Sequence, residues 1–369
     1  MSTSAQFDRS RRHERTRRRR PYKPRIEVGI LGATGAVGQQ FASLLAAHPW
    51  FRATWLAASG RSVGKRYSEL AWRLPVACPS YIAEIPVETV KAGRGPKLIF
   101  SALDPSVAGE VEEEFAAAGH WVVSNARNHR MDSLVPLLVP EVNPGHLGLI
   151  SQQQKSRDWS GAIATNPNCS TVFLAMTLAA LRPLRPRRVL VTTLQALSGA
   201  GYPGVSSLDA TANIVPFIGG EEEKIECETR KILGSLANNS VTPAPFVISA
   251  QATRVPVVYG HTETISVECE EAASPEDILA AFRAFSGEPQ RLHLPSAPAQ
   301  PIICHDDFDR PQPRLDVEKF GGMAVQVGRV RSCPVLGNKF VLLGHNTIRG
   351  AAGGTLLIAE LMHALGMLG

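Results

Sequence analysis

The chain has 369 residues, of which 44% are hydrophobic and 20% are charged, and no apolar run reaches the roughly 18 residues that a membrane span needs. This length suffices for about two domains with cores of their own. The six cysteines are scattered without a C-x-x-C pair, so the sequence predicts neither a metal site nor a disulfide framework and favours the cytoplasm.

The net charge of +6 is concentrated at the N-terminus. Residues 1–25 contain nine arginines and one lysine against two acids, so the rest of the chain is slightly acidic. A run of like charge with prolines and no apolar period predicts a disordered arm over residues 1–24. Such an arm could touch a polyanion by charge alone, but a dispensable tail is the simpler interpretation. No specific nucleic-acid partner and no membrane partner are expected.

From residue 25 the chain alternates between strands and helices. Apolar residues alternate over 26–30, and after a glycine-rich turn they recur at helical spacing. Further strands are predicted at 53–59, 97–103 and 120–126, with a helix over 106–119. This pattern predicts an α/β fold in which residues 25–160 form a Rossmann-type, doubly wound parallel sheet that binds its ligand at the carboxyl ends of the strands.

The turn after the first strand reads GATGAVG over residues 32–38. Glycines at this spacing allow a tight turn and let backbone N–H groups approach a pyrophosphate at the start of the following helix. A turn that merely joins strand to helix is the alternative interpretation. The predicted cofactor contacts in this turn are Gly32, Thr34, Gly35, Ala36 and Val37.

The segment after the second predicted strand bears on the choice of cofactor. NAD-selective folds place an acid there to hold the ribose 2′-hydroxyl, whereas the 2′-phosphate of NADP needs cations and hydroxyls. This chain has Ser59, Arg61, Ser62 and Lys65 and no acid. The segment therefore predicts NADP, with a solvated basic loop as the alternative.

After about residue 160 the strands become longer, at 187–197, 245–258 and 262–270. They predict an antiparallel or mixed sheet in a second, α+β domain over residues 161–345. The last segment, 346–369, contains an apolar helix that we expect to pack back on the first domain.

The hexapeptide NPNCST over residues 166–171 places Cys169 at the start of an apolar stretch of helical length. The N–H groups and the dipole at a helix N-terminus are expected to lower the pKa of a thiol and to favour the nucleophilic thiolate. A lone cysteine is more often a core residue, so this interpretation needs a base and an anion site elsewhere.

The segment RVPVVYGHTE supplies both groups. Arg254 and His261 lie at the end of one predicted strand and the start of the next. Arginine binds a carboxylate through two parallel hydrogen bonds, and histidine exchanges protons near neutral pH. With the thiol and a nicotinamide fold, they predict an aldehyde dehydrogenase that works through a thioester.

With these motifs, the chain resembles the aspartate-β-semialdehyde dehydrogenases, in the branch shared by archaea, fungi and some bacteria. The resemblance covers residues 25–369 and is carried by ten motifs in order: GATGAVG, ASGRSVGKRY, SNARNHRM, PEVN, NPNCST, TLQALSGAG, GGEEEKIECETRKIL, RVPVVYGHTE, DRPQPRLD and HNTIRGAAGG.

The resemblance implies a role for each matching residue. Cys169 would be the nucleophile, His261 the general acid/base, and Gln195 would orient the substrate. Arg254 would bind the α-carboxylate, Glu221 and Lys224 the amino group and phosphate, and Arg130 with Asn128 the acyl phosphate or inorganic phosphate. Asn346 would hold the nicotinamide carboxamide, while Ser198 and Gly199 would line the cofactor site.

The implied reaction is the NADPH-dependent conversion of L-aspartyl-4-phosphate to L-aspartate 4-semialdehyde, a step toward lysine, threonine and methionine, in a homodimer or homotetramer. A malonyl-CoA reductase or another acyl-phosphate reductase would share the nucleophile and the fold. A non-catalytic nucleotide- or RNA-binding protein is the alternative from another class, but it would have no physical need for Cys169, Arg254 and His261 together.

Overall fold

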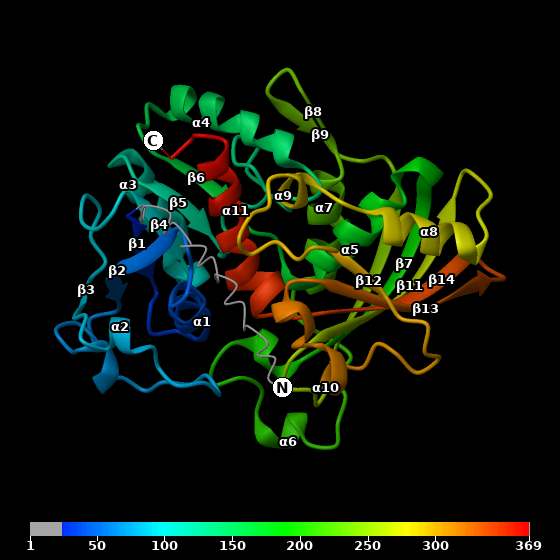
Figure 1. Cartoon of the computed structure of the whole chain (residues 1–369), viewed down its shortest axis with the longest axis horizontal. Coiled ribbons are helices and arrows are strands. Elements are labelled where there is room, and N and C mark those ends of the chain that lie inside the picture. The colour runs from blue at the N-terminus through cyan, green and yellow to red at the C-terminus, as the bar shows by residue number, and fades with distance from the viewer. Residues whose placement is uncertain (1–23, 369) are drawn as a thin grey trace, which may run out of the picture.

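The computed structural model describes residues 24–368, so the predicted arm lies outside the described residues except for residue 24. The described chain forms two six-stranded sheets and a separate two-stranded hairpin. Figure 1 shows the two large sheets at opposite ends of the molecule, with helix α11 (Gly353–Ala364) between them.

The first sheet has the strand order β3-β2-β1-β4-β5-β6, and every neighbouring pair is parallel. Its strands are β1 (Ile26–Leu31), β2 (Phe51–Ala58), β3 (Val87–Thr89), β4 (Leu98–Ser101), β5 (Trp121–Ser124) and β6 (Ala162–Thr165). The chain adds strands on one side of β1 and then on the other, so the order reverses between β1 and β4. Open parallel sheets bind their ligands at such a switch point. The predicted Rossmann-type sheet is confirmed.

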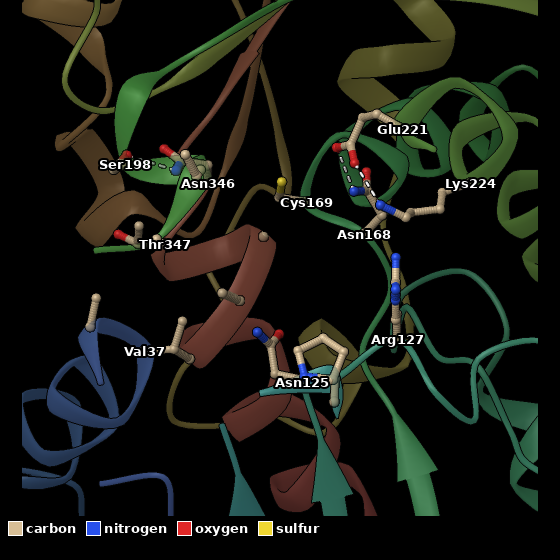
Figure 2. Close-up of a pocket in the computed structure, with 18 of the residues that line it drawn as sticks. Val37, Asn125, Arg127, Asn168, Cys169, Ser198, Glu221, Lys224, Asn346 and Thr347 are labelled. Carbon is tan, nitrogen blue, oxygen red and sulfur yellow. Dashed lines mark hydrogen bonds and ion pairs between the residues drawn. The ribbon is translucent and has the colours of Figure 1, made fainter. Parts of the chain in front are cut away.

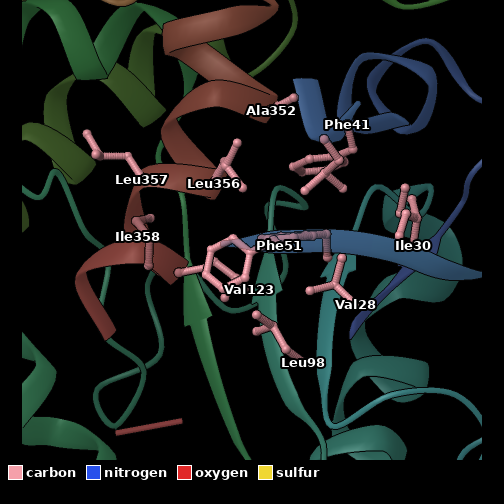
Figure 3. Close-up of a cluster of buried hydrophobic side chains, with 14 of the residues drawn as sticks. Val28, Ile30, Phe41, Phe51, Leu98, Val123, Ala352, Leu356, Leu357 and Ile358 are labelled. Carbon is pink, nitrogen blue, oxygen red and sulfur yellow. The ribbon is translucent and has the colours of Figure 1, made fainter. Parts of the chain in front are cut away.

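Helices cover both faces of this sheet, as a doubly wound fold requires. On one face lie α1 (Ala36–Leu45) and α11, and on the other lies α3 (Pro105–Ala117). Figure 3 shows the first core, in which Phe41 of α1 and Leu356 of α11 share one buried cluster with Phe51 and Leu98. The helix that ends the chain thus belongs to the core of the first domain.

Strand β6 lies beyond the predicted domain boundary at residues 160–161, yet it pairs with β5 in the parallel sheet. The boundary was therefore placed too early, because a four-residue apolar strand is too short to show a recognisable alternation. The chain leaves the first sheet at Thr165 and enters α5 (Cys169–Ala180), which packs in the second domain. The loop over residues 166–168 is one connection between the domains, and the segment from β14 to α11 is the return.

The second sheet has the order β10-β7-β11-β14-β13-β12 and is mixed, as predicted. Its strands are β7 (Pro186–Gln195), β10 (Val247–Arg254), β11 (His261–Cys269), β12 (Ile302–Cys304), β13 (Val325–Cys333) and β14 (Gly337–Gly344). Helices α5, α7 (Glu221–Ile232) and α8 (Pro275–Ala284) share its apolar core. This packing brings the first turns of α5 and α7 to the edge that faces the first domain.

The remaining α-helices and a two-stranded hairpin lie outside these two sheets. They are the helices α2 (Ser80–Ala83), α4 (Leu149–Arg157), α6 (Ser207–Ala210), α9 (Glu288–Arg291) and α10 (Pro313–Asp316), and the hairpin of β8 (Ser235–Ala237) and β9 (Ser240–Thr242). Over residues 24–368, no helix combines the length and the hydropathy of a membrane span, and no cluster of His, Cys, Asp and Glu side chains could hold a metal ion.

Candidate active site

A cavity of about 450 Å³ opens where the two domains meet. The first domain lines it with Ala36, Val37 and Arg130, and the second domain with Cys169, Glu221, Lys224 and Arg254. Ser198, Gly199 and Asn346 complete the wall on the predicted cofactor side. Figure 2 shows Val37 on one side of this cavity, with Cys169, Glu221 and Lys224 on the other. Residues far apart in the sequence thus converge on one space.

Cys169 is the first residue of α5, as the sequence predicts. The preceding residue, Asn168, caps this helix, because its Oδ1 atom accepts hydrogen bonds from the backbone N–H groups of Ser170 at 3.0 Å and Thr171 at 3.2 Å. The cap fixes the first turn of the helix and with it the direction of the thiol. The polar Asn168 therefore has a structural reason to precede the cysteine.

His261 lies against the thiol, with its Nε2 atom 3.1 Å from the Sγ atom of Cys169. On the other side of the ring, the backbone N–H of Ala196 donates to Nδ1 at 3.0 Å. A backbone N–H group only donates, so Nδ1 is an acceptor and the neutral ring carries its hydrogen on Nε2. The imidazole therefore presents an N–H group to the sulfur.

Burial decides the protonation of this pair. It raises the pKa of the Cys169 thiol to about 12, where Glu221 also acts to raise it and Arg130 and Arg254 act to lower it. Burial likewise lowers the pKa of His261 to about 3, with Arg254 acting in the same direction. The predicted lowering of the thiol pKa is wrong for this structure, because the loss of water outweighs the helix N-terminus.

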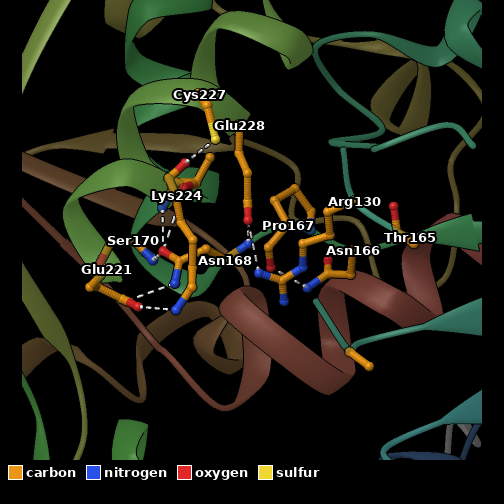
Figure 4. Close-up of polar contacts among 12 residues, drawn as sticks. Arg130, Thr165, Asn166, Pro167, Asn168, Ser170, Glu221, Lys224, Cys227 and Glu228 are labelled. Atoms are coloured by element: carbon orange, nitrogen blue, oxygen red, sulfur yellow. Dashed lines mark hydrogen bonds and ion pairs between the residues drawn. The ribbon is translucent and has the colours of Figure 1, made fainter. Parts of the chain in front are cut away.

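Glu221 is the centre of a polar network beside the thiol, which Figure 4 shows together with Asn168 and Lys224. Its Oε1 atom accepts from Asn168 Nδ2 at 2.6 Å and from Gln195 Nε2 at 3.0 Å, and its Oε2 atom lies 3.1 Å from Lys224 Nζ. Burial acts to raise the pKa of Glu221, but Lys224 and these hydrogen bonds outweigh it, and the pKa lies below its usual value. The carboxylate is therefore ionised.

Three acids stand in a row at the start of α7, and the structure distinguishes the first two. Glu221 is buried at the cavity, whereas the Oε1 atom of Glu222 accepts from the backbone N–H of Ala252 at 2.9 Å. Glu222 thus ties α7 to β10 and does not line the cavity. Glu221 and Lys224 lie on one face of α7, as their spacing of three residues predicts, and there they pair with each other.

Arg130 lines the cavity with its guanidinium already held by protein groups. Its Nη1 atom lies 3.1 Å from Glu228 Oε1, and its Nη2 atom donates to the carbonyl of Asn125 at 2.9 Å. Asn128, the predicted partner for phosphate, does not line the cavity, since its side-chain amide donates to the carbonyl of Pro105. Arg127, which the sequence analysis did not single out, lines the cavity instead.

Arg254 ends β10 and projects into the cavity from the second domain. Its Nη1 atom donates to the carbonyl of Ala196 at 2.8 Å. A Cβ atom at Gly199 would lie 2.9 Å from this Nη1 atom and 2.9 Å from His261 Cε1. Glycine at 199 therefore keeps the space in front of both side chains open.

The turn between β1 and α1 fits a dinucleotide phosphate. Gly32 adopts a φ of +71°, and a Cβ atom there would lie 2.4 Å from the carbonyl oxygen of Ala102. No side chain caps the first turn of α1, so its backbone N–H groups are available to an anion. Thr34, Gly35, Ala36 and Val37 lie in this turn and at the start of the helix, and the last two reach the cavity.

Asn346 and Ser198, which also line the cavity, are joined by a hydrogen bond. Asn346 Nδ2 donates to Ser198 Oγ at 2.8 Å, and the backbone N–H of Gly260 donates to Asn346 Oδ1 at 2.9 Å. One hydrogen of the Asn346 amide remains for a ligand. This wall therefore presents a fixed N–H donor.

The residues predicted to select NADP lie in the turn that follows β2. Ser59, Arg61 and Lys65 are exposed there, and Ser62 is partly exposed. They lie outside the lining of the cavity that contains Cys169. Because β2 neighbours β1, this turn is at the same edge of the sheet as the glycine loop.

The comparisons with known proteins fit this geometry. A model of the NAD-binding domain of semialdehyde dehydrogenases matches residues 27–150, and a model of their dimerisation domain matches residues 178–349. The aspartate-semialdehyde dehydrogenase of Archaeoglobus fulgidus is 48% identical over 92% of this chain and 98% of that protein. The chain belongs to the aspartate-semialdehyde dehydrogenase family. The aspartate-semialdehyde dehydrogenase of Cryptococcus neoformans is 46% identical over 94% of this chain and 99% of that protein.

Solved structures of the aspartate-semialdehyde dehydrogenase family show the same fold. The Candida albicans enzyme with NADP has a TM-score of 0.86 at 41% identity, and the match covers 93% of this chain and all of that one. The Vibrio cholerae enzyme complexed with ASA has a TM-score of 0.74 at 26% identity, over 92% of this chain and 99% of that one. The fold predicted from sequence is thus that of the family, and the chain contains the domain described as the family's dimerisation domain.

Proposed function

We propose that this protein is an NADP-dependent, phosphorylating aspartate-semialdehyde dehydrogenase that reduces L-aspartyl-4-phosphate to L-aspartate 4-semialdehyde through a thioester on Cys169. The observation that carries the proposal is the pair of Cys169 and His261, 3.1 Å apart, beside a cavity lined by Arg254, Glu221 and Arg130. Membership of the family supports the same reaction.

The cavity matches the charges of an aspartyl substrate. Arg254 binds the α-carboxylate through its guanidinium, as arginine does with carboxylates elsewhere. The ionised Glu221 receives the α-amino group, and Gln195, bonded to Glu221, helps to orient the substrate. Together these contacts place the substrate's γ-carbonyl next to the sulfur of Cys169.

The phosphate of the substrate, and inorganic phosphate in the reverse reaction, needs cationic partners. Arg130 and Lys224 line the cavity and bind the phosphate. Arg127 also lines the cavity and binds the phosphate with them. Arg130 is held by Glu228 and the carbonyl of Asn125, so it meets the phosphate in a fixed position. Asn128 has no part in this set.

In the biosynthetic direction, the sulfur of Cys169 attacks the γ-carbonyl. The bond from the carbonyl carbon to the phosphate oxygen breaks, and the thiol proton passes to the departing phosphate, which leaves as hydrogen phosphate. When bound, NADPH supplies the hydride that reduces the resulting thioester. The Nε2–H group of His261 donates to the sulfur as negative charge develops on it during the attack. It donates again when the tetrahedral oxyanion collapses to the aldehyde and releases the thiolate, which then takes a proton from water. This donor role replaces the base half of the acid/base role predicted from sequence, because Nε2 already carries a hydrogen.

The turn over residues 32–37 holds the pyrophosphate of NADP, while Asn346 donates to the nicotinamide carboxamide, next to Ser198 and Gly199. Ser59, Arg61, Ser62 and Lys65 receive the 2′-phosphate. The protein is expected to work in the cytoplasm as a homodimer or homotetramer, with inorganic phosphate as a small-molecule partner.

One assay tests this proposal. NADPH formation is followed with aspartate semialdehyde and NADP, in the presence and absence of phosphate, and the rate should require phosphate. A malonyl-CoA reductase, the main alternative, would instead oxidise NADPH with malonyl-CoA and show no phosphate-dependent oxidation of the semialdehyde. The matched control is Cys169→Ser, in which phosphate-dependent NADPH formation should be lost.

A further inference from the structure

The carboxyl group of Glu263 is buried two residues after His261 on β11, and the mechanism proposed above does not use it. Glu263 is 0% exposed and follows His261 by two residues on β11, so both side chains point to the same face of the strand. The next members of this face, Ile265 and Val267, belong to the apolar core that includes α5. A carboxyl in this row costs stability, because a buried polar group without a partner is unfavourable.

Glu263 has no ordinary hydrogen bond within residues 24–368, since neither of its carboxyl oxygens has a partner there. Burial raises the pKa of this carboxyl well above its usual value; the nearby hydroxyl of Ser170 acts to lower it, and Glu221 acts to raise it. The carboxyl is therefore protonated more readily than an exposed one, and a protonated carboxyl can both accept and donate.

Two hydroxyl groups adjoin this acid. Cross-strand pairing places Thr193 of β7 opposite Glu263, and Ser170 lies in the first turn of α5, which packs on β11. Gln195 Nε2 lies 3.0 Å from Ser170 Oγ and 3.4 Å from Thr193 Oγ1. The two hydrogens of this amide nitrogen go to the two nearer acceptors, Ser170 Oγ and Glu221 Oε1 at 3.0 Å. The Ser170 oxygen thus accepts from Gln195, and its own hydrogen remains to be given to another acceptor. Glu263 is the acceptor on that side.

We propose that Glu263 is a positioning residue that acts through Ser170 on Gln195. Its carboxyl accepts the Ser170 hydroxyl hydrogen, which turns the Ser170 oxygen toward Gln195 Nε2. The same Nε2 atom donates to Glu221 Oε1 at 3.0 Å. Glu263 thereby fixes the side-chain amide that adjoins the reacting carbonyl, and this inference rests on the proposed function.

Three variants separate positioning from mere packing. Glu263→Leu has a similar size but cannot accept a hydrogen bond, and Glu263→Gln keeps a neutral acceptor of the same shape. Ile265→Val, one step further along the same buried face, is the matched control for damage to the core. For each variant, kcat and KM for phosphate-dependent oxidation of aspartate semialdehyde are measured together with the Tm.

We expect Glu263→Leu to lower kcat by about 100-fold, as small misplacements at a reacting centre do. Tm should change little, because the lost hydrogen bond from Ser170 is offset by removal of a buried carboxyl from an apolar row. Glu263→Gln should restore most of the lost kcat. Ile265→Val should lower Tm through the lost methyl group and leave kcat unchanged. In Ser170→Ala, which removes the intermediary, the further change Glu263→Leu should have little effect.

Wild-type kcat in Glu263→Leu would overturn the inference, and so would a fall in Glu263→Gln as large as that in Glu263→Leu. A parallel loss of Tm and kcat in Glu263→Leu would also overturn it, since that result describes a packing role. The wild-type assay is read first: a wild-type protein that does not oxidise the semialdehyde overturns the proposed function. An active wild type with an active Glu263→Leu overturns only the role of Glu263.

Discussion

The backbone N–H of Ala196 donates to Nδ1 of His261 at 3.0 Å, and this bond determines which form of the imidazole faces the catalytic thiol. Since Nδ1 accepts, Nε2 carries the hydrogen and lies 3.1 Å from the sulfur of Cys169. A ring in this state stabilises negative charge on sulfur or oxygen but does not take up a second proton, and burial lowers its pKa to about 3. We therefore expect His261 to act as a hydrogen-bond donor in the reaction.

The donor role of His261 predicts that glutamine replaces it better than alanine. The amide of Gln carries an N–H group and has no basic nitrogen, so His261→Gln should keep the donor and lose any base. We expect His261→Ala to lower kcat by about 100- to 1,000-fold, the usual effect of removing an oxyanion donor, and His261→Gln to lose much less. Equal losses in steady-state kcat would show that a base is required.

The high pKa of Cys169 predicts how its reactivity changes with pH. The thiolate is the reactive form, and burial raises the pKa of this thiol to about 12, so the thiolate fraction should rise about tenfold for each pH unit from pH 6 to 10. The rate at which iodoacetamide inactivates the enzyme should rise in parallel. A rate that is already constant near neutral pH would mean that a stable thiolate exists in the free enzyme.

Glu221 and Glu222 form a natural pair of test and control. Glu221→Gln removes the charge that receives the substrate's amino group, and we expect the KM for the semialdehyde to rise about 10- to 100-fold, since a buried charged hydrogen bond contributes about 1.5–3 kcal/mol. The carboxylate of Glu222 accepts from the backbone N–H of Ala252 at 2.9 Å and does not line the cavity, so Glu222→Gln should leave the KM for the semialdehyde unchanged. Similar KM values for both variants would place the amino group elsewhere.

The turn after β2 predicts a loss that is specific to NADP. In the double variant Arg61→Ala, Lys65→Ala, NADP binding should weaken, and NAD binding should stay nearly the same, because only the 2′-phosphate loses its partners. The control is Arg66→Ala. In the wild type, the Arg66 guanidinium pairs with Glu84 at 2.7 Å on the surface, so its loss should leave the binding of both cofactors unchanged. Calorimetric titration with both cofactors gives the answer, and equal weakening of NAD and NADP would show that these residues support the loop or the shared part of the cofactor.

Local patterns predicted much of this molecule, because they act over short stretches of chain. Alternating apolar residues and the glycine turn were enough for the parallel sheet, and the apolar stretch after Cys169 was enough to place the thiol at a helix start. Arg254 and His261 were predicted at the end of one strand and the start of the next along the chain, where the structure also has them. In each case, the residues that determine the local structure lie within a few positions of one another in the sequence.

Features that depend on distant contacts were not accessible in this way. The amide of Ala196 meets His261 across 65 positions, and no local signal links them. The high pKa of the thiol depends on burial by both domains, which a helix start does not reveal. Arg127 and Asn128 are neighbours in the sequence, and only packing decided that Arg127 would reach the cavity. Glu263 looks like an ordinary strand residue until its burial is known.

The thioester on Cys169 is the central claim, and mass spectrometry of the intact enzyme tests it most directly. The protein is mixed with aspartate semialdehyde and NADP in the absence of phosphate, so that the acyl group has no acceptor, and is quenched in acid. We predict one equivalent of NADPH, a mass increase equal to one aspartyl group located on the peptide that contains Cys169, and neither signal in Cys169→Ser. NADPH formation without a change in mass, or an acyl group on another residue, would contradict the account.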